Sequence, residues 1–332
     1  MKSFRVDLWE ENEYTYKQSY GFMPNIMAFL HDEDDSKRDA IIVAPGGGYC
    51  MCAPHEGELV AMEFFKKGMN AFVITYTTDI TFSEPLKTQP SDDLARAIRV
   101  VRYNSEEYRV NAGHLAICGF SAAGHLCATV ATHFDDLKDK NPKYAEISCR
   151  PDAVILGYPV ITSGDFTHGS SMEALLGRDA SEEEKTYYSL EKNVTENTPQ
   201  CFIWQTLGDS LVPVENSYLF AEALKAKKVG YAQYVFPSGD HGLSIASDEM
   251  FAGWKGGDYS MEQLHKVIEH VKDDTLVGVS ERRCKELKEQ FLSGNNQEPP
   301  KPNPNKPFVN PFKDIAMWPE LAYIWMSRVF NI

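Results

Sequence analysis

Residues 114–126 read "HLAICGFSAAGHL", an apolar run that passes through small residues into a helical pattern. The apolar residues 114–120 predict a buried strand, and the pattern that follows predicts a helix over about 122–133. Ser121 lies at the junction, and this context is typical of the G-x-S-x-G nucleophile elbow. Ala123 stands where that motif has its second glycine. On this motif alone, a glycine-rich strand-to-helix turn without catalytic function is an equal alternative.

Short apolar runs alternate with helical patterns along most of the chain. Strands are predicted at 40–45, 70–76, 114–120, 152–159, 200–209 and 231–237. Helices are predicted at 56–68, 91–104 (with Ser91 as the N-cap), 122–133, 216–230, 280–292 and 317–330. This alternation predicts an α/β fold whose mostly parallel sheet is covered by helices on both faces. In such sheets, ligands bind beyond the carboxyl ends of the strands.

Two regions interrupt this alternation, although we expect residues 1–332 to form a single domain. Residues 160–198 contain only short helix-like pieces and are predicted to form a cap-like insertion beside the pocket. Residues 247–312 are predicted to form a second insertion, helical and then proline-rich, because a run of prolines cannot pack as helix or sheet. Ser260 and Gln263 have the spacing of a capping box for its first helix. This insertion is expected either to cover the strand-end face near the pocket or to lie in a dimer interface.

The composition excludes several kinds of partner. The 332 residues include 33 basic and 48 acidic side chains, for a net charge of −15, whereas nucleic acids and anionic membranes bind positive surfaces. No apolar segment at the N-terminus resembles a secretory signal, and no run approaches the roughly 18 residues of a membrane span. The seven cysteines show no zinc-ligand spacing and suggest reduced thiols. We therefore expect a cytoplasmic protein that binds no metal ion.

Two further loops follow predicted strands at the same edge of the sheet as Ser121. Asp209 lies in "TLGDSLVP" (206–213), just past the strand "CFIWQ", and His241 lies in "FPSGDHGL" (236–243), just past the final strand. The order Ser121, Asp209, His241 is the one expected of an α/β-hydrolase triad. In that arrangement His241 takes the proton from Ser121, while Asp209 fixes the tautomer of His241 and stabilises its imidazolium.

The glycine-rich segment "PGGGY" (45–49) directly follows the strand 40–45. Its glycines allow backbone N–H groups to approach a tetrahedral intermediate closely, as an oxyanion hole requires. The turn after Ser121 also brings the N–H of Ala122 beside the serine oxygen. Pro45 stands where the HGGG loop of esterases has its histidine. A flexible glycine turn without function is the alternative, and nucleotide binding is disfavoured because neither the dinucleotide nor the P-loop motif is present.

Two residues compete for roles in the triad. His125 follows Ser121 closely, but it lies within the helix, so we expect packing or capping rather than general-base catalysis. Asp240 adjoins His241, and neighbours in a chain rarely present their side chains to each other, so Asp209 is the preferred acid.

Other polar side chains near the glycine-rich segment and the strands have more than one interpretation. His55 and Glu56 are expected to form a local polar network. Tyr49 and Tyr158 are candidates for substrate-binding residues that line the pocket, and ordinary burial of both rings is the alternative.

Together, these segments resemble the α/β-hydrolase esterases of the acetyl-xylan esterase and BD-FAE type, within the esterase/lipase group. The matching segments are "IIVAPGGGY", "NAFVITYTT", "DDLARAIRVVR", "LAICGFSAAGHL", "GYPVI", "LGDSLVPVENSYLFAEAL" and "FPSGDHGLS". They lie within residues 15–246, and the resemblance returns near "MWPELAYIW". Residues 247–312 have no recognised counterpart.

The resemblance implies a fold, a chemistry and specific roles. It implies Ser121 as the nucleophile with Asp209 and His241 as its partners, and an oxyanion hole made of the N–H groups of Gly47, Gly48 and Ala122. It also implies a cofactor-free serine carboxylesterase that removes acetyl or other short acyl groups from small-molecule or oligosaccharide esters, such as acetylated xylo-oligosaccharides. We expect an acyl-enzyme intermediate, in a monomer or a homo-oligomer. The alternatives are an amidase, formamidase or peptidase with the same triad, and a non-catalytic hydrolase-like binding protein.

Overall fold

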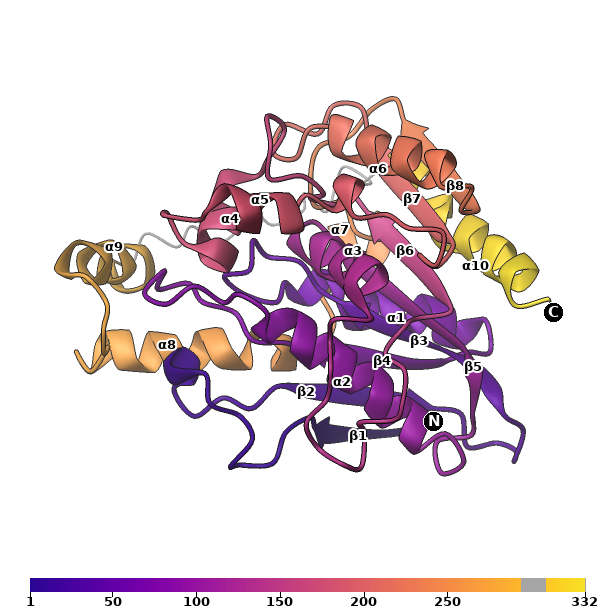
Figure 1. Cartoon of the computed structure of the whole chain (residues 1–332), viewed down its shortest axis with the longest axis horizontal. Coiled ribbons are helices and arrows are strands. Elements are labelled where there is room, and N and C mark those ends of the chain that lie inside the picture. The colour runs from indigo at the N-terminus through magenta and orange to yellow at the C-terminus, as the bar shows by residue number, and fades with distance from the viewer. Residues whose placement is uncertain (294–308, 332) are drawn as a thin grey trace.

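The computed structural model describes residues 1–293 and 309–331. Within these residues, an eight-stranded sheet forms the centre of the molecule, with the strand order β1-β2-β4-β3-β5-β6-β7-β8 (Figure 1). Its strands are β1 (Lys2–Asp7), β2 (Asn25–Leu30), β3 (Arg38–Ala44), β4 (Asn70–Thr75), β5 (Val110–Phe120), β6 (Ala153–Gly157), β7 (Cys201–Thr206) and β8 (Tyr231–Phe236). β2 pairs antiparallel with both β1 and β4, and every other neighbouring pair is parallel. The mostly parallel sheet predicted from the alternating pattern is therefore confirmed.

Helices cover both faces of the sheet. One face packs against α2 (Gln89–Tyr103), α3 (Ala122–His133) and α6 (Glu215–Ala226), and the other packs against α1 (Glu58–Lys66) and α10 (Trp318–Val329). Successive side chains of a strand point to opposite faces, so in β3 Ile42 joins the first layer, whereas Ile41 and Val43 join the second. All three are completely buried. Burial on both faces explains why the parallel strands read as continuous apolar runs.

The two segments that interrupt the strand–helix pattern form additional helices. α4 (Gly169–Leu176) and α5 (Glu182–Tyr187) lie between β6 and β7, and their apolar side chains join the first layer. After β8 come α7 (Asp248–Phe251), α8 (Glu262–Lys272) and α9 (Glu281–Leu292). α8 and α9 form a small apolar cluster with Ile80, on the side of the molecule away from both chain termini (Figure 1). Of the predicted proline-rich stretch, residues 294–308 lie outside the described residues.

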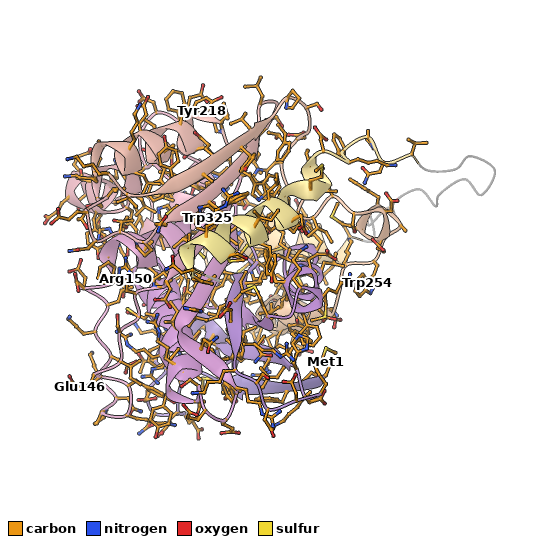
Figure 2. The ribbon with its side chains drawn as sticks, turned by 90° about the vertical axis from the view of Figure 1, so that its right-hand side faces the viewer. Met1, Glu146, Arg150, Tyr218, Trp254 and Trp325 are labelled. Carbon is orange, nitrogen blue, oxygen red and sulfur yellow. The ribbon has the colours of Figure 1, made fainter. Side chains whose placement is uncertain are left out.

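The C-terminal helix α10, which confirms the predicted helix at 317–330, packs on the sheet. Figure 2 shows this helix in front of the sheet, with Trp325 labelled. Trp318 stacks on Trp204 of β7, with 5.3 Å between the ring centroids and 20° between the ring planes. Trp325 packs against Phe202 of the same strand. Buried aromatic pairs of this kind stabilise a core beyond the area that they bury.

The predicted N-cap of α2 is wrong. The helix begins at Gln89, so Ser91 lies inside it, and the Ser91 hydroxyl donates to the carbonyl of Thr88 at 2.7 Å. Pro90 explains the earlier start, because a proline in the first helical turn gives up an N–H that has no partner there.

The predicted capping box of Ser260 and Gln263 is also wrong. The Gln263 side chain accepts from the N–H of Thr78 at 2.8 Å and donates to the carbonyl of the same residue at 2.6 Å. The Ser260 hydroxyl donates to the carbonyl of Cys52. Both side chains therefore connect the start of α8 to the loops at the carboxyl ends of β3 and β4.

Candidate active site

Three loops at the carboxyl ends of β5, β7 and β8 bring Ser121, Asp209 and His241 together. Nε2 of His241 lies 2.8 Å from Oγ of Ser121, and Nδ1 of His241 lies 2.8 Å from Oδ2 of Asp209. The three side chains singled out in the sequence therefore form one continuous chain of hydrogen bonds, although they are spread over 120 positions of sequence.

Ser121 occupies a strained turn between β5 and α3. Its φ of 52° and ψ of −122° are uncommon for a residue with a side chain. A Cβ on Gly119 would lie 2.1 Å from the carbonyl oxygen of Ala123, and a Cβ on Gly124 would lie 2.6 Å from Cβ of Pro159. Ala123 itself is fully buried in the core. The turn therefore needs glycine at 119 and 124 and accommodates the alanine at 123.

Asp209 holds the imidazole of His241 in one orientation. Its side chain is fully buried, and Oδ1 accepts from the N–H groups of Leu211 at 3.0 Å and Val212 at 2.8 Å. Oδ2 is left for His241. Because an ionised carboxylate only accepts hydrogen bonds, Nδ1 of His241 carries the proton and Nε2 accepts from Ser121. This is the tautomer in which a histidine can act as a general base towards the serine.

Asp240 does not occupy the position of the acid. Its Oδ1 accepts from the N–H and the hydroxyl of Ser210 and from the N–H of His241, at 3.0, 2.8 and 2.8 Å. These hydrogen bonds lower the pKa of Asp240, and the largest cause is the backbone N–H of Ser210. Asp240 thus connects the loop after β8 to the loop after β7, and Asp209 contacts the imidazole.

The glycine-rich segment after β3 forms a tight turn. Gly47 has a φ of 128° and Gly48 a φ of 68°, values that favour glycine. The carbonyl of Gly47 accepts from the N–H groups of Cys50 and Met51. In the described part of the chain, the N–H groups of Gly47, Gly48 and Ala122 donate to no protein acceptor. The fold therefore uses none of the three predicted oxyanion-hole donors for a hydrogen bond of its own among the described residues.

His125 is a buried structural residue, as its place in α3 suggested. Its Nδ1 lies 2.9 Å from the hydroxyl oxygen of Tyr49, and its Nε2 lies 3.0 Å from the carbonyl oxygen of Tyr188. Burial lowers the pKa of His125 to about 4. A histidine that is fully buried and bonded at both nitrogens has no lone pair to offer to Ser121.

The two tyrosines predicted to line the pocket are buried instead. Tyr49 and Tyr158 are each 1% exposed. The hydroxyl of Tyr49 bonds to His125, and the hydroxyl of Tyr158 donates to Oε1 of Glu56 at 2.6 Å. The ring of Tyr158 meets the ring of His241 in a T-shaped contact, with 4.8 Å between centroids. Both hydroxyls are thus hydrogen-bonded within the protein, and the two residues pack beneath the site rather than line a pocket.

The insertion between β6 and β7 adds a histidine that no sequence pattern indicated. Nδ1 of His168 lies 2.7 Å from Oγ of Ser171 in α4, and that Oγ lies 3.9 Å from where a Cβ on Gly48 would stand. Burial lowers the pKa of His168, and the nearby His241 lowers it further. The imidazole of His168, from the insertion, thus lies near His241 and the glycine-rich turn.

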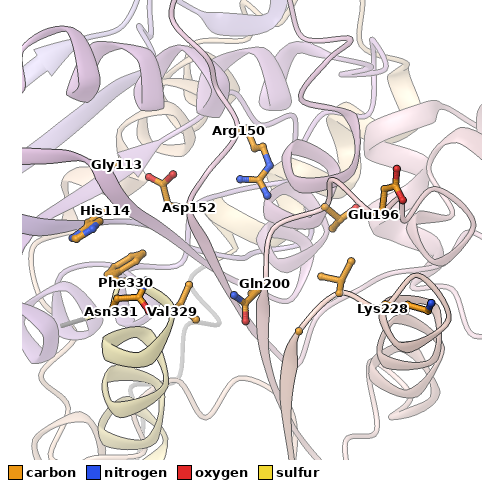
Figure 3. Close-up of a pocket in the computed structure, with 13 residues that line it drawn as sticks. Gly113, His114, Arg150, Asp152, Glu196, Gln200, Lys228, Val329, Phe330 and Asn331 are labelled. Atoms are coloured by element: carbon orange, nitrogen blue, oxygen red, sulfur yellow. The ribbon is translucent and has the colours of Figure 1, made fainter.

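The cavity drawn in Figure 3 lies at the amino ends of the parallel strands, opposite to the ends that carry Ser121, Asp209 and His241. It has a volume of about 680 Å³ and is lined by residues that precede parallel strands, among them Asp152 before β6, Gln200 before β7 and Gly230 before β8. Asp152 is already paired with Arg102 at 2.8 Å. Because ligands of parallel sheets bind at the carboxyl ends of the strands, this cavity is separate from the candidate active site.

Three further observations concern thiols, metals and membranes. All seven cysteines are free, and burial raises the pKa values of the Cys50 and Cys52 thiols to about 12. Within residues 1–293 and 309–331, no group of three histidine, cysteine, aspartate or glutamate side chains is placed to hold a metal ion. Over the same ranges, no helix combines the length and the apolar character that crossing a membrane requires.

Comparison with known proteins adds relationships to this geometry. The family model described as BD-FAE matches residues 28–224. The chain is 61% identical over 263 residues to endo-1,4-beta-xylanase B of Butyrivibrio fibrisolvens, and this alignment covers 79% of the chain and 41% of that protein. It is 29% identical over 228 residues to an acetylxylan esterase of Xylanibacter ruminicola, and this alignment covers 67% of the chain and 44% of that protein. The chain thus spans about two fifths of the length of these curated relatives.

A solved structure extends the likeness to nearly a whole protein. The crystal structure of an acetyl ester-xyloside bifunctional hydrolase from Caldicellulosiruptor lactoaceticus matches with a TM-score of 0.69 and 36% sequence identity. The match covers 82% of this chain and 97% of that chain. The predicted α/β-hydrolase fold is therefore confirmed.

Proposed function

The chain belongs to the BD-FAE family of α/β-hydrolase esterases, and we propose that it is a serine carboxylesterase that removes acetyl groups from acetylated sugars or xylo-oligosaccharides. The observation on which this proposal rests is the hydrogen-bonded chain from Ser121 through His241 to Asp209. The substrate class is supported by the names of two similar proteins, an acetylxylan esterase and an acetyl ester-xyloside hydrolase.

In the proposed acylation step, the proton of Ser121 passes to Nε2 of His241 while Oγ attacks the carbonyl carbon of the acetyl ester. The carbonyl oxygen becomes an oxyanion, which accepts hydrogen bonds from the N–H groups of the glycine-rich turn and of Ala122. When the tetrahedral intermediate collapses, the sugar oxygen leaves and takes the proton from the imidazolium. The products are a free sugar hydroxyl and an acetyl group on Ser121.

Deacylation repeats the same proton transfers with water. His241 removes a proton from a water molecule, whose oxygen attacks the acetyl carbon, and the second tetrahedral intermediate uses the same oxyanion donors. Its collapse breaks the bond to Ser121, which recovers its proton from His241, and acetate leaves. The buried carboxylate of Asp209 stabilises the imidazolium that forms in both steps.

The xylanase name of one relative does not favour glycoside hydrolysis at this site. Glycosidases use a pair of carboxylates on either side of the glycosidic bond, whereas this hydrogen-bonded chain ends in a serine hydroxyl at a strained turn. The alignment covers only 41% of that relative, so the name describes a protein much longer than the matched part.

The nucleophile is tested by hydrolysis of 4-nitrophenyl acetate with the wild type and with Ser121→Ala. We expect the variant to lose kcat by a factor on the order of a million, the loss seen when a triad nucleophile is removed. An unchanged rate in the variant would contradict the assignment of Ser121. A matched 4-nitroanilide substrate separates an esterase from an amidase, because the amidase alternative requires a comparable kcat/KM on the anilide.

The substrate class is tested by the acetate released from acetylated xylo-oligosaccharides, acetylated manno-oligosaccharides and simple sugar acetates. We expect acetate from at least the xylose-based substrates, at a kcat/KM above that for 4-nitrophenyl acetate, since a fitted sugar adds binding energy in the transition state. If only 4-nitrophenyl acetate is cleaved, the esterase chemistry stands and the sugar substrate is wrong.

A further inference from the structure

A buried carboxylate lies behind the proposed oxyanion hole. The side chain of Glu56 is 4% exposed. Its Oε2 accepts from the N–H of Gly46 at 2.7 Å, and its Oε1 accepts from the hydroxyl of Tyr158 at 2.6 Å. Burying a carboxylate is costly unless hydrogen bonds replace its hydration. Nε2 of the neighbouring His55 lies 3.9 Å from Oε1, as a local polar network would have it, and the two oxygens of Glu56 also accept hydrogen bonds from two different parts of the active site.

The first of these bonds fixes the glycine-rich turn against the nucleophile. Gly46 immediately precedes the proposed oxyanion donors, and it packs so closely that a Cβ there would lie 2.5 Å from the carbonyl oxygen of Phe120 and 3.0 Å from Cβ of Ser121. The hydrogen bond from the Gly46 N–H to Glu56 restrains the peptide immediately before Gly47 and Gly48, the proposed oxyanion donors.

The second bond fixes the loop that supplies the catalytic histidine. The hydroxyl oxygen of Tyr158 also accepts from the N–H of Ser244 at 3.1 Å, three residues after His241. Ser244 has a φ of 46°, and such a strained conformation persists only where the surroundings hold it. The ring of Tyr158 packs on His241 itself. Glu56 therefore reaches the histidine loop through one tyrosine.

We propose that Glu56 is a positioning residue that sets the oxyanion donors and His241 in register with Ser121, through Gly46 on one side and Tyr158 on the other. The role rests on the proposed function, because it concerns the geometry of that reaction. A carboxylate suits the role since it accepts from both donors and has no hydrogen of its own to place. In Glu56→Gln, one of the two acceptors becomes an NH₂ group that faces a donor.

The test separates turnover from stability. Glu56→Ala, Glu56→Gln and Tyr158→Phe are compared with the wild type by the pre-steady-state burst of 4-nitrophenol, which counts active sites, and by kcat and KM per counted site. We expect Glu56→Ala to lower kcat per site by about 100-fold with little change in KM, because loss of one oxyanion donor costs about 10²–10³ in kcat. Glu56→Gln keeps the size and one acceptor, so we expect about a tenfold loss.

A matched control is Asp93→Asn in α2. Asp93 is also a fully buried carboxylate, and it accepts hydrogen bonds from Trp9, Thr77 and Gln89, none of which belongs to the site. We expect this variant to lower the melting temperature without changing kcat per counted site. The double variant Glu56→Gln/Tyr158→Phe should lose less than the product of the single losses, since the two residues act through one connection.

Two results would overturn the proposal. The first is a Glu56→Gln or Glu56→Ala protein that melts at a lower temperature but turns over normally at each counted site. The second is an unchanged low-field NMR signal of the proton on Nδ1 of His241 in these variants, which a displaced histidine loop would shift or broaden. The NMR signal does not depend on esterase activity. If the wild type does not hydrolyse 4-nitrophenyl acetate, the proposed function fails, and the signal still decides whether Glu56 positions His241.

Discussion

Replacement of Asp209 by asparagine should reverse the tautomer of His241. Oδ1 of Asp209 accepts from two backbone N–H groups, and Oδ2 accepts from His241. An asparagine at 209 has a single acceptor oxygen, which the two N–H groups would retain, so its NH₂ group would face Nδ1 of His241. That nitrogen would have to accept, and Nε2 would carry the proton. A protonated Nε2 cannot take the proton of Ser121.

The expected loss follows from this reversal. A triad acid changed to its amide, with the geometry otherwise intact, lowers kcat by about 10⁴-fold, which corresponds to about 5 kcal/mol of transition-state stabilisation. Asp209→Asn should therefore retain roughly one part in 10⁴ of the kcat on 4-nitrophenyl acetate. Its melting temperature should change little, because the side chain keeps its shape and all three hydrogen-bonded contacts, one of them with donor and acceptor exchanged.

Asp240→Asn is the matched control, since Asp240 adjoins His241 but bonds to Ser210 and to the backbone rather than to the imidazole ring. We expect its kcat to stay within about tenfold of the wild type, as for an exposed hydrogen-bonded side chain. An Asp209→Asn protein within tenfold of the wild type would refute the tautomer argument. An equal loss in both variants would mean that loop geometry, rather than the imidazole contact, determines the rate.

Three further predictions concern the residues that support the site. Burial lowers the pKa of His125 from 6.5 to about 4, so as the pH falls the unfolded chain binds this proton before the folded chain does. The contribution of His125 to the free energy of unfolding is therefore fully present above pH 6.5. It is lost between pH 6.5 and 4, by on the order of 3 kcal/mol. Burial raises the pKa of Asp93 to about 7, and this titration opposes the trend. The measurement is therefore the difference in unfolding free energy between the wild type and His125→Gln, from urea unfolding at pH 7.5 and at pH 4.5. A difference that does not depend on pH would contradict the prediction for His125. Gly119→Ala should prevent folding or lower stability by about 3 kcal/mol or more, since its Cβ would meet backbone at 2.1 Å, and normal expression and melting would count against the close approach. Ala123→Gly should cost only about 1 kcal/mol of helix stability and leave kcat within about twofold, whereas a large gain in activity would mean that the alanine strains the turn.

The contact among Ser121, Asp209 and His241 could be predicted from the sequence because each of these residues directly follows a recognisable strand. Parallel strands place their carboxyl ends at one edge, so order and position along the chain were enough to bring Ser121, Asp209 and His241 together. The turn accepts Ala123 in place of the second glycine of the elbow motif, because the tight contact is made by Gly124 against Pro159. The strands β1 and β2 were not predicted, since their short segments lie outside the alternating strand–helix pattern.

Residues that act through long-range contacts could not be predicted in the same way. Glu56 bonds to Tyr158, 102 positions away, and nothing near either residue in the sequence indicates the pair. For Tyr158 the sequence left pocket lining and burial open, because aromatic residues at strand ends suit both, and the structure buries its ring. Serine is a residue type that N-caps favour, but Pro90 favours a helix start before Ser91. The preference of Ser91 for the N-cap is therefore overridden by its neighbour.

The hydrogen bond between Trp318 and Ser244 has a consequence for when the proposed esterase activity appears during synthesis of the chain. The indole N–H of Trp318 donates to the carbonyl of Ser244 at 2.8 Å, across 74 positions of sequence. Ser244, the strained residue three positions after His241, is thus held by a helix that leaves the ribosome well after Ser121, Asp209 and His241. We expect the emerging chain to remain unable to hydrolyse esters until that helix has docked.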